Sequence, residues 1–229
     1  MSCFRKPGPR THSGSRFSET RSCRGGQAVI VTGAVEGDLD EALLRRILAY
    51  AGLSLGKVYG RTGKQSLLQS IEGYNSAARF SLWIVLIDLN GDFDCAPVCV
   101  QHLLPSQSEN MYLRVAVRAA EAWVLGDRQR IAEWLGISLS RIPANPDSLA
   151  YPKQELVNLA RRSRRRTLQS DLVPREGSGR AVGPLYTSRL IDFIQDETNG
   201  WRPDQAMAAS DSLSRCVERL RHLAAAAET

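Results

Sequence analysis

The chain has 229 residues, of which 43% are hydrophobic and 24% charged, and this is ordinary for a globular protein with one sizeable core. No apolar run approaches the roughly 20 residues that span a bilayer, and no apolar segment follows the basic N-terminus. The five cysteines show no framework spacing. We therefore expect a cytoplasmic protein with reduced thiols and no membrane partner.

The net charge of +6 is unevenly distributed. Residues 1–26 carry +5 of it and are rich in Ser, Arg, Gly and Pro, so we expect a disordered basic tail. The remainder of the chain is close to neutral. The pI of 9.3 is therefore poor evidence that the folded part binds nucleic acid.

From residue 27 onward, apolar segments that predict strands alternate with amphipathic segments that predict helices. The predicted strands are Ala28–Val35, Leu55–Tyr59, Ser81–Leu89 and Met111–Val117. The predicted helices are Asp40–Ala51, Lys64–Phe80, Cys95–Leu104 and Ala119–Leu125. This alternation is typical of a parallel sheet. We predict that residues 27–126 form an α/β core, a mostly parallel four-stranded sheet flanked by helices.

Residues 127–229 are predicted to form a helical extension that packs on this core as a cap. The predicted helices are Arg128–Leu135, Lys153–Arg166, Tyr186–Ile194 and Pro203–Ala225. A Pro-rich connection, Ile142–Pro152, and a Gly-rich loop, Pro174–Gly183, separate some of them.

Acidic residues follow the first and third predicted strands. Glu36 and Asp40 come after the first strand, and Asp88 and Asp92 come at the end of the third. In open α/β sheets, functional groups gather at the carboxyl ends of the strands. If the two strands are neighbours, Glu36 and Asp88 face one crevice and could share a hard divalent ion such as Mg²⁺. The alternative is that these acids cap helices and form turns, and spacing alone leaves both interpretations open.

The same residues carry a family resemblance. Glu-Gly-x-x-Asp after the first strand, with an Asp-x-Asp position after the third, resembles the TOPRIM fold of primases, topoisomerases and OLD-type nucleases. More closely, the chain resembles the DUF4276 group of TOPRIM-like bacterial proteins, over nearly everything after the tail. The matching stretches are Val35–Asp40, Cys95–Pro97, Arg114–Trp123, Tyr151–Lys153, Val182–Tyr186 and Ser210–Leu213.

The resemblance implies phosphodiester chemistry with Mg²⁺, or with Mn²⁺ in its place. Glu36 would act as general acid/base and Asp88 would bind the metal. The full set of metal-ligand candidates is Glu36, Asp40, Asp88, Asn90, Asp92 and Glu121. In one departure from the pattern, Asn90 stands where the second acid of Asp-x-Asp belongs. An amide oxygen is a weaker Mg²⁺ ligand than a carboxylate, and Asp92 could substitute from the same turn.

The resemblance further implies a nuclease that works beside an ATPase partner, in bacterial defence against phage or plasmids. The alternative is a non-catalytic TOPRIM-like module that binds nucleic acid or a partner ATPase, with Asn90 as the trace of lost activity. The oligomeric state stays open.

Arg118 and Glu121 lie one helical turn apart after the fourth strand. Arg118 could hold a phosphate in a catalytic role, and Glu121 could be a further metal ligand. The alternative is an ion pair between residues i and i+3 at a helix start.

A run of arginines is the strongest local concentration of charge. Together with Lys153 it is predicted to contact nucleic-acid phosphates, and the alternative is a solvated helix end. The run comprises Arg161, Arg162, Arg164, Arg165 and Arg166. It has no interleaved aromatic residues, so sequence-specific recognition is not expected.

Overall fold

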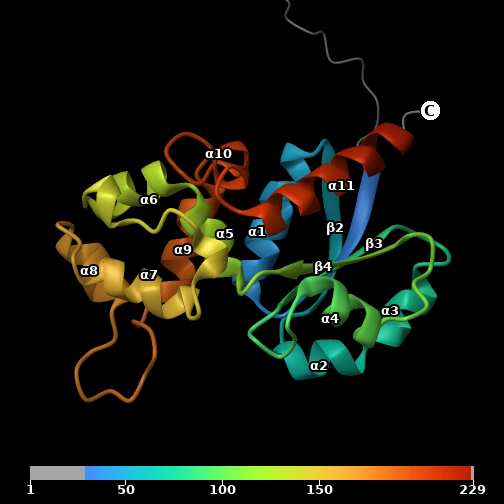
Figure 1. Ribbon diagram of the computed structural model, residues 1–229, viewed down its shortest axis with the longest axis horizontal. Helices are drawn as coiled ribbons and strands as arrows, with labels where there is room; N and C mark the ends of the chain where they lie inside the picture. Colours follow the sequence, from blue (N-terminus) through green and yellow to red (C-terminus); the bar gives the residue numbers. More distant parts are fainter. Residues whose placement is uncertain (1–28, 228–229) are drawn as a thin grey trace, which may run out of the picture.

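The computed structural model describes residues 29–227, and the predicted tail of residues 1–26 lies outside them. Four parallel strands form one sheet in the order β2-β1-β3-β4 (Figure 1). The strands are β1 (Val29–Val35), β2 (Leu53–Gly60), β3 (Trp83–Asp88) and β4 (Met111–Ala116). Helices flank the sheet, so the predicted α/β class and the parallel four-stranded sheet are confirmed.

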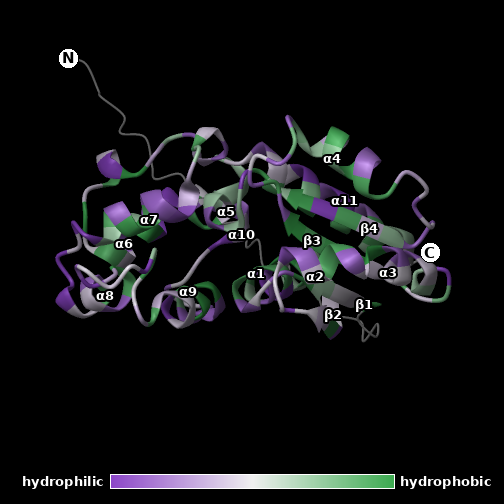
Figure 2. Ribbon diagram, turned by 90° about the horizontal axis from the view of Figure 1, so that it is seen from below, coloured by the Kyte–Doolittle hydropathy of each residue, from purple (hydrophilic) through white to green (hydrophobic). Residues whose placement is uncertain are grey.

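The two central strands are the most apolar because both of their faces are covered. Residues Trp83 to Ile87 of β3 are all buried, and β3 is drawn largely in the hydrophobic colour between the helices (Figure 2). The edge strand β2 is mostly half-buried. The continuous apolar run in the sequence therefore marks the centre of the sheet.

Successive side chains of β1 and β3 point to opposite faces of the sheet, and two hydrophobic clusters result. On one face, Val35 and Leu86 pack with α1 (Asp38–Tyr50), α5 (Ala120–Gly126) and α11 (Asp211–Ala227). On the other face, Ala34 and Val85 pack with α2 (Lys64–Gln69), α3 (Ile71–Ala77) and α4 (Ala96–Leu103).

Besides α11, five further α-helices after residue 127 share the first of these clusters. They are α6 (Arg128–Leu135), α7 (Pro152–Ala160), α8 (Arg166–Leu172), α9 (Tyr186–Gln195) and α10 (Pro203–Met207). Trp201 is fully buried, and its Nε1 donates to the backbone oxygen of Trp123 in α5 at 3.1 Å. The carboxyl-terminal helices thus hold α5 and α1 against the sheet.

Three helices predicted as continuous are interrupted, and those predictions were wrong. Lys64–Phe80 is divided at Ser70 into α2 and α3, Lys153–Arg166 stops at Ala160, and Pro203–Ala225 is divided into α10 and α11. Serine hydroxyls compete for backbone groups at two of these breaks. Ser163 Oγ accepts from Arg165 N at 3.0 Å, and Ser210 Oγ accepts from Leu213 N at 3.2 Å.

Within residues 29–227, none of the helices is long and apolar enough to cross a membrane.

Candidate functional site

The order of the strands brings two predicted site residues together. Because β1 and β3 are parallel neighbours, their carboxyl ends meet at one edge of the sheet. There Glu36 Oε1 accepts a hydrogen bond from the backbone N–H of Asp88 at 2.8 Å. The expected crevice between these two residues therefore exists.

Two further acids join them from helix starts, and we call Glu36, Asp40, Asp88 and Glu121 the carboxylate cluster. Asp40 and Glu121 lie in the first turns of α1 and α5, and both are buried. All four line a cavity of about 300 Å³. Lys153 and Tyr186 line the same cavity.

Helix capping accounts for part of this arrangement. Asp40 Oδ2 accepts from Gly37 N at 2.9 Å, and Asp88 Oδ1 accepts from Ala120 N, at the start of α5, at 2.8 Å. Each cap uses one carboxylate oxygen. The other oxygens of Asp40, Asp88 and Glu36 accept no hydrogen bond from any residue in 29–227. Hydrogen bonding within residues 29–227 therefore leaves one oxygen of each of these three carboxylates available to a ligand.

Burial and mutual repulsion raise the pKa values in the cluster. Burial, followed by the charges of Glu36 and Glu121, raises the pKa of Asp40 to about 7. Burial, followed by the charges of Asp40, Glu121 and Glu36, raises the pKa of Asp88 to about 8. The pKa of Glu36 is also raised, chiefly by burial. The protein alone supplies too little positive charge to keep all these groups ionised at neutral pH.

Among the described residues, one cation and one hydroxyl contact the carboxylate of Glu121. Lys153 Nζ lies 3.5 Å from Glu121 Oε1, and the hydroxyl of Tyr186 donates to the same oxygen at 3.3 Å. Burial, and then Glu121, raises the pKa of Tyr186 well above its usual value. The alternative of an Arg118–Glu121 ion pair is not formed, since Glu121 pairs with Lys153 instead.

A second cavity, of about 440 Å³, shares Glu36, Asp88 and Lys153 with the first. Arg118 and Tyr151 also line it. In the described part of the chain, no carboxylate forms an ion pair with Arg118. The guanidinium of Arg118 is therefore available to bind an anion that enters the cavity beside Glu36 and Asp88.

The turn after β3 separates two candidate ligands. Asn90 has a φ of 54°, in the left-handed region, and its backbone N–H donates to Arg118 O at 2.8 Å, so it lies on the second cavity. Asp92 instead forms an ion pair with Lys64 at 2.6 Å and lines neither cavity. The same Lys64 donates to the backbone oxygen of Asp88. Asp92 therefore lies outside both cavities, whereas Asn90 lines one of them.

Carboxylates are the ligands that Mg²⁺ and Mn²⁺ prefer, so the chemistry of the carboxylate cluster fits such an ion. Its raised pKa values also indicate a place where a cation would relieve repulsion. Between residues 29 and 227, however, no three His, Cys, Asp or Glu side chains are already set around one metal-sized position. Ligation would require the side chains to close together.

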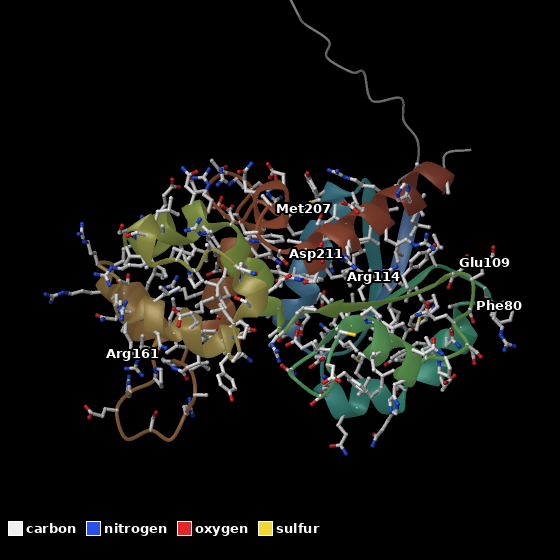
Figure 3. All side chains as sticks on the ribbon, in the orientation of Figure 1. Phe80, Glu109, Arg114, Arg161, Met207 and Asp211 are labelled. Atoms are coloured by element: carbon white, nitrogen blue, oxygen red, sulfur yellow. The ribbon has the colours of Figure 1, made fainter. Side chains whose placement is uncertain are left out.

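The arginine strip, Arg161, Arg162, Arg164, Arg165 and Arg166, lies between the end of α7 and the start of α8 (Figure 3, where Arg161 is labelled). All five residues are exposed. Arg165 Nη2 donates to Glu133 O at 3.1 Å, and within residues 29–227 none of the five forms an ion pair. Lys153 lies at the other end of α7, a helix of 9 residues. The length of α7, about 13 Å, therefore separates the arginine strip from Lys153 and the cavities.

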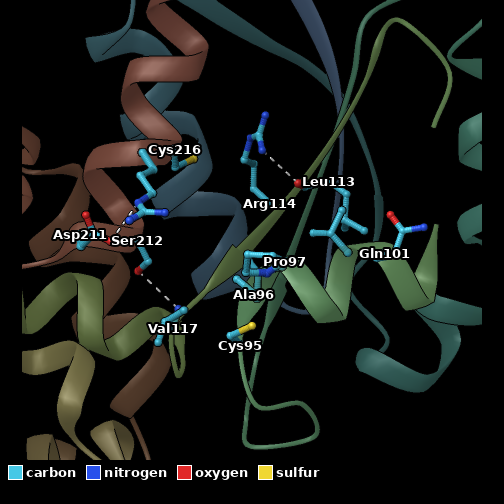
Figure 4. Close-up of a pocket in the computed structure, with 13 residues that line it drawn as sticks. Cys95, Ala96, Pro97, Gln101, Leu113, Arg114, Val117, Asp211, Ser212 and Cys216 are labelled. Atoms are coloured by element: carbon cyan, nitrogen blue, oxygen red, sulfur yellow. Dashed lines mark hydrogen bonds and ion pairs between the residues drawn. The ribbon is translucent and has the colours of Figure 1, made fainter. Parts of the chain in front are cut away.

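A cavity of about 540 Å³ lies elsewhere, between α4 and α11 beside the edge strand β4 (Figure 4). Its lining is mainly apolar, and it contains none of the carboxylate cluster. Ser212, from one of the family-like stretches, borders it and accepts from Trp123 Nε1 at 2.7 Å. That stretch therefore fixes α11 to α5, away from the acids.

Three residues at or next to the two cavities were not among the candidate site residues, although Tyr151 and Tyr186 lie in two of the family-like stretches. Lys64 begins α2 after β2, and the sheet order alone brings it to Asp88. Tyr186 reaches Glu121 across 65 residues of sequence. Tyr151 precedes α7 as a single exposed aromatic residue. All three depend on contacts between distant segments.

Comparison of the chain with protein-family models, curated proteins and solved structures gives no match. The resemblance to the TOPRIM-like DUF4276 group therefore stays a prediction from the sequence.

Proposed function

We propose that the carboxylate cluster is the site of a TOPRIM-like, metal-dependent nuclease that acts on phosphodiester bonds of nucleic acid. The observation that carries the proposal is the pair Asp40 and Asp88. Asp40 is buried and Asp88 is half-buried among other carboxylates, and their pKa values are raised to about 7 and about 8. Shifts of this kind are typical of functional sites, because folding alone gains nothing from the repulsion.

Asp88, Glu36, Asp40 and Glu121 would hold Mg²⁺ or Mn²⁺. Such an ion, when bound, neutralises phosphate charge and lowers the pKa of bound water. The chain's own residues supply the rest of the chemistry. The raised pKa of Glu36 brings it closer to neutral pH, as a general acid/base requires. Arg118 and Lys153 lie on the cavity that adjoins the acids and would orient the phosphate.

An ATPase partner and a role in defence against phage or plasmids complete the proposal on the strength of the resemblance. The second candidate is a non-catalytic module that binds nucleic acid or a partner ATPase. The observations that favour it are Asn90 at the acid position and the absence, within residues 29–227, of three ligands already set for a metal.

A cleavage assay tests the proposal. The full chain is incubated with single- and double-stranded DNA and RNA in Mg²⁺, Mn²⁺ or EDTA. We expect cleavage with either metal and none in EDTA, and we expect Glu36→Gln to reduce the rate by about 100-fold or more. Glu72→Gln on α3, an exposed acid outside both cavities, is the matched control. Full activity of folded Glu36→Gln would reject the mechanism, and binding without cleavage would favour the non-catalytic module.

A further inference from the structure

An exposed aromatic ring stands at the cavity that adjoins the carboxylate cluster. Tyr151 is 77% exposed and lines the cavity of about 440 Å³ together with Glu36 and Asp88. A single exposed aromatic residue is ordinary on a protein surface. This one is unusual in its place, because the acids and two cations line the same cavity.

The backbone of Tyr151 is held in position. Tyr151 is the N-cap residue of α7, and its carbonyl oxygen accepts from Glu155 N at 3.0 Å. Pro152, which is buried, follows it and restricts the backbone before the helix. The ring therefore projects from a fixed helix start, so ordering its backbone adds little cost to binding.

The residues around the ring match the parts of a nucleotide. The face of a tyrosine ring stacks on any base, and guanidinium and ammonium groups bind phosphate. Arg118 has no ion-pair partner in the described residues, and Lys153 is 57% exposed despite its contact with Glu121. One cavity thus presents a stacking surface and two phosphate contacts beside the acids.

We propose that Tyr151 stacks on a base of a single-stranded nucleic acid whose adjoining phosphate lies between Arg118 and Lys153. The inference rests on the proposed function and deepens it by naming the form of the substrate. In a duplex both faces of each base are already stacked, so a single strand or an unpaired end fits this ring best.

The arginine strip favours a polymer over a free nucleotide. Lys153 lies at the first turn of α7, and Arg161 follows its last residue. Further exposed arginines continue past this end of the helix. A strand that leaves the cavity along α7 meets positive charge again about 13 Å away. A mononucleotide would use only the first of these two regions.

Binding in EDTA, where no cleavage occurs, tests the inference. A labelled strand of about 12 nucleotides is titrated with the full chain, as DNA and as RNA, beside a blunt duplex of the same sequence. We expect Tyr151→Ala to weaken single-strand binding by about 5- to 150-fold, the range of base–aromatic stacking. Tyr151→Phe, which keeps the ring, should bind within about twofold of the original protein.

Phe80→Ala is the matched control. Phe80 is also an exposed aromatic residue, 90% exposed, and it precedes β3 at the end opposite to Asp88 (Figure 3). Its loss should leave binding unchanged. A series of strands with one abasic position each gives a second measurement. At one position, loss of the base should weaken binding to the original protein. The same abasic strand should bind Tyr151→Ala about as well as the intact strand does, because the tyrosine ring that stacks on this base is already absent.

Equal affinity of Tyr151→Ala and the original protein for the single strand would overturn the inference, and so would tighter binding of a duplex or a free nucleoside monophosphate. Failure of the inference is distinguishable from failure of the proposed function. Metal-dependent cleavage that Tyr151→Ala leaves intact rejects the stacking alone. Coupling between Tyr151 and one base, without cleavage in Mg²⁺ or Mn²⁺, rejects the nuclease alone and supports the stacking.

Discussion

Glu36 Oε1 accepts the backbone N–H of Asp88 at 2.8 Å, so one predicted catalytic side chain orients the backbone of another site residue 52 positions later. The bond joins the carboxyl ends of β1 and β3. Glu36 thus has two roles, as a hydrogen-bond acceptor and as a negative charge, and a substitution can separate them. A glutamine at this position keeps an acceptor oxygen for the Asp88 N–H and lacks the charge.

We therefore predict different effects of two substitutions on the metal-free protein. Glu36→Gln should leave the free energy of unfolding within about 1 kcal/mol of the original, because the bond is kept and a repulsive charge is removed. Glu36→Ala should cost about 1–3 kcal/mol, because the part-buried N–H of Asp88 loses its acceptor. Urea unfolding measures both. Equal stability of the two variants would show that the bond contributes little.

The raised pKa values of Asp40 and Asp88 predict that stability falls as the pH rises. The ordinary pKa of both groups is 3.8, whereas the native values are about 7 and about 8. Between these limits the native state binds more protons than the unfolded state. The contribution of these two carboxyls to the free energy of unfolding is therefore largest below about pH 4 and decreases toward pH 8, by up to about 1.4 kcal/mol per pH unit for each group.

Urea unfolding in EDTA at a series of pH values checks this dependence. Asp88→Asn should flatten the upper part of the profile, because it removes the group with the higher pKa. The difference between the two profiles reports the titration of Asp88 together with its repulsion of the neighbouring carboxyls. A free energy of unfolding that rises from pH 5 to pH 8, or an unchanged slope in Asp88→Asn, would contradict the account.

An ion pair between a buried aspartate and a half-buried arginine outside the site is predicted to hold the carboxyl-terminal helices. Asp127 is 1% exposed and accepts from Arg202 Nη2 at 2.8 Å and Nε at 2.9 Å. Asp127→Ala should lower the free energy of unfolding by about 2–4 kcal/mol, because it removes the acceptor of these bonds and of the backbone N–H groups of Arg130 and Arg202. The exposed Asp204→Ala, two residues after Arg202, is the control and should have little effect. A loss under about 1 kcal/mol for Asp127→Ala would refute the assigned role.

Much of the sheet and half of the candidate site followed from local patterns. The apolar run through Trp83–Asp88 indicated a central strand, and the parallel order placed Glu36 beside Asp88. The breaks at Ser163 and Ser210 could not be foreseen, because each serine also donates to a residue far along the chain, Leu135 O and Asp147 Oδ1. Helical spacing continued across both breaks, and the serine hydroxyls that bind backbone groups there are also held by these distant contacts.

The geometry of the site also depends on contacts between distant segments, which local sequence patterns do not show. Asp92 was named as a residue that could substitute for the acid missing at Asn90. Both residues follow β3 in one turn, and spacing cannot show which of them lines the cavity. Lys64 holds Asp92 away, and this contact needs β2 to be a neighbour of β1. Glu36 and Asp88 were predicted because they are acidic and stand at the ends of strands. The sheet itself determines their relative position, so this part of the site could be predicted.

The arginine strip is predicted to give nucleic-acid binding its salt dependence. Arg162→Gln with Arg164→Gln should flatten the slope of log affinity against log salt by about 1.8 for duplex DNA and about 1.4 for a single strand. Both residues are exposed, so stability should change little. Arg79→Gln with Arg215→Gln removes two other exposed cations and is the matched control. An unchanged slope in the first variant would mean that the strip does not contact phosphates.

Binding of Mn²⁺ to the metal-free protein, followed by electron paramagnetic resonance at pH 8, measures whether the carboxylate cluster holds a metal ion. We predict saturable binding that Asp88→Asn or Glu36→Gln weakens by about tenfold or more, while Glu72→Gln leaves it unchanged. We also predict tighter binding at pH 8 than at pH 6, because protons compete for Asp40 and Asp88. Absence of Mn²⁺ binding, or binding that both cluster variants leave intact, would contradict a metal site at the carboxylate cluster.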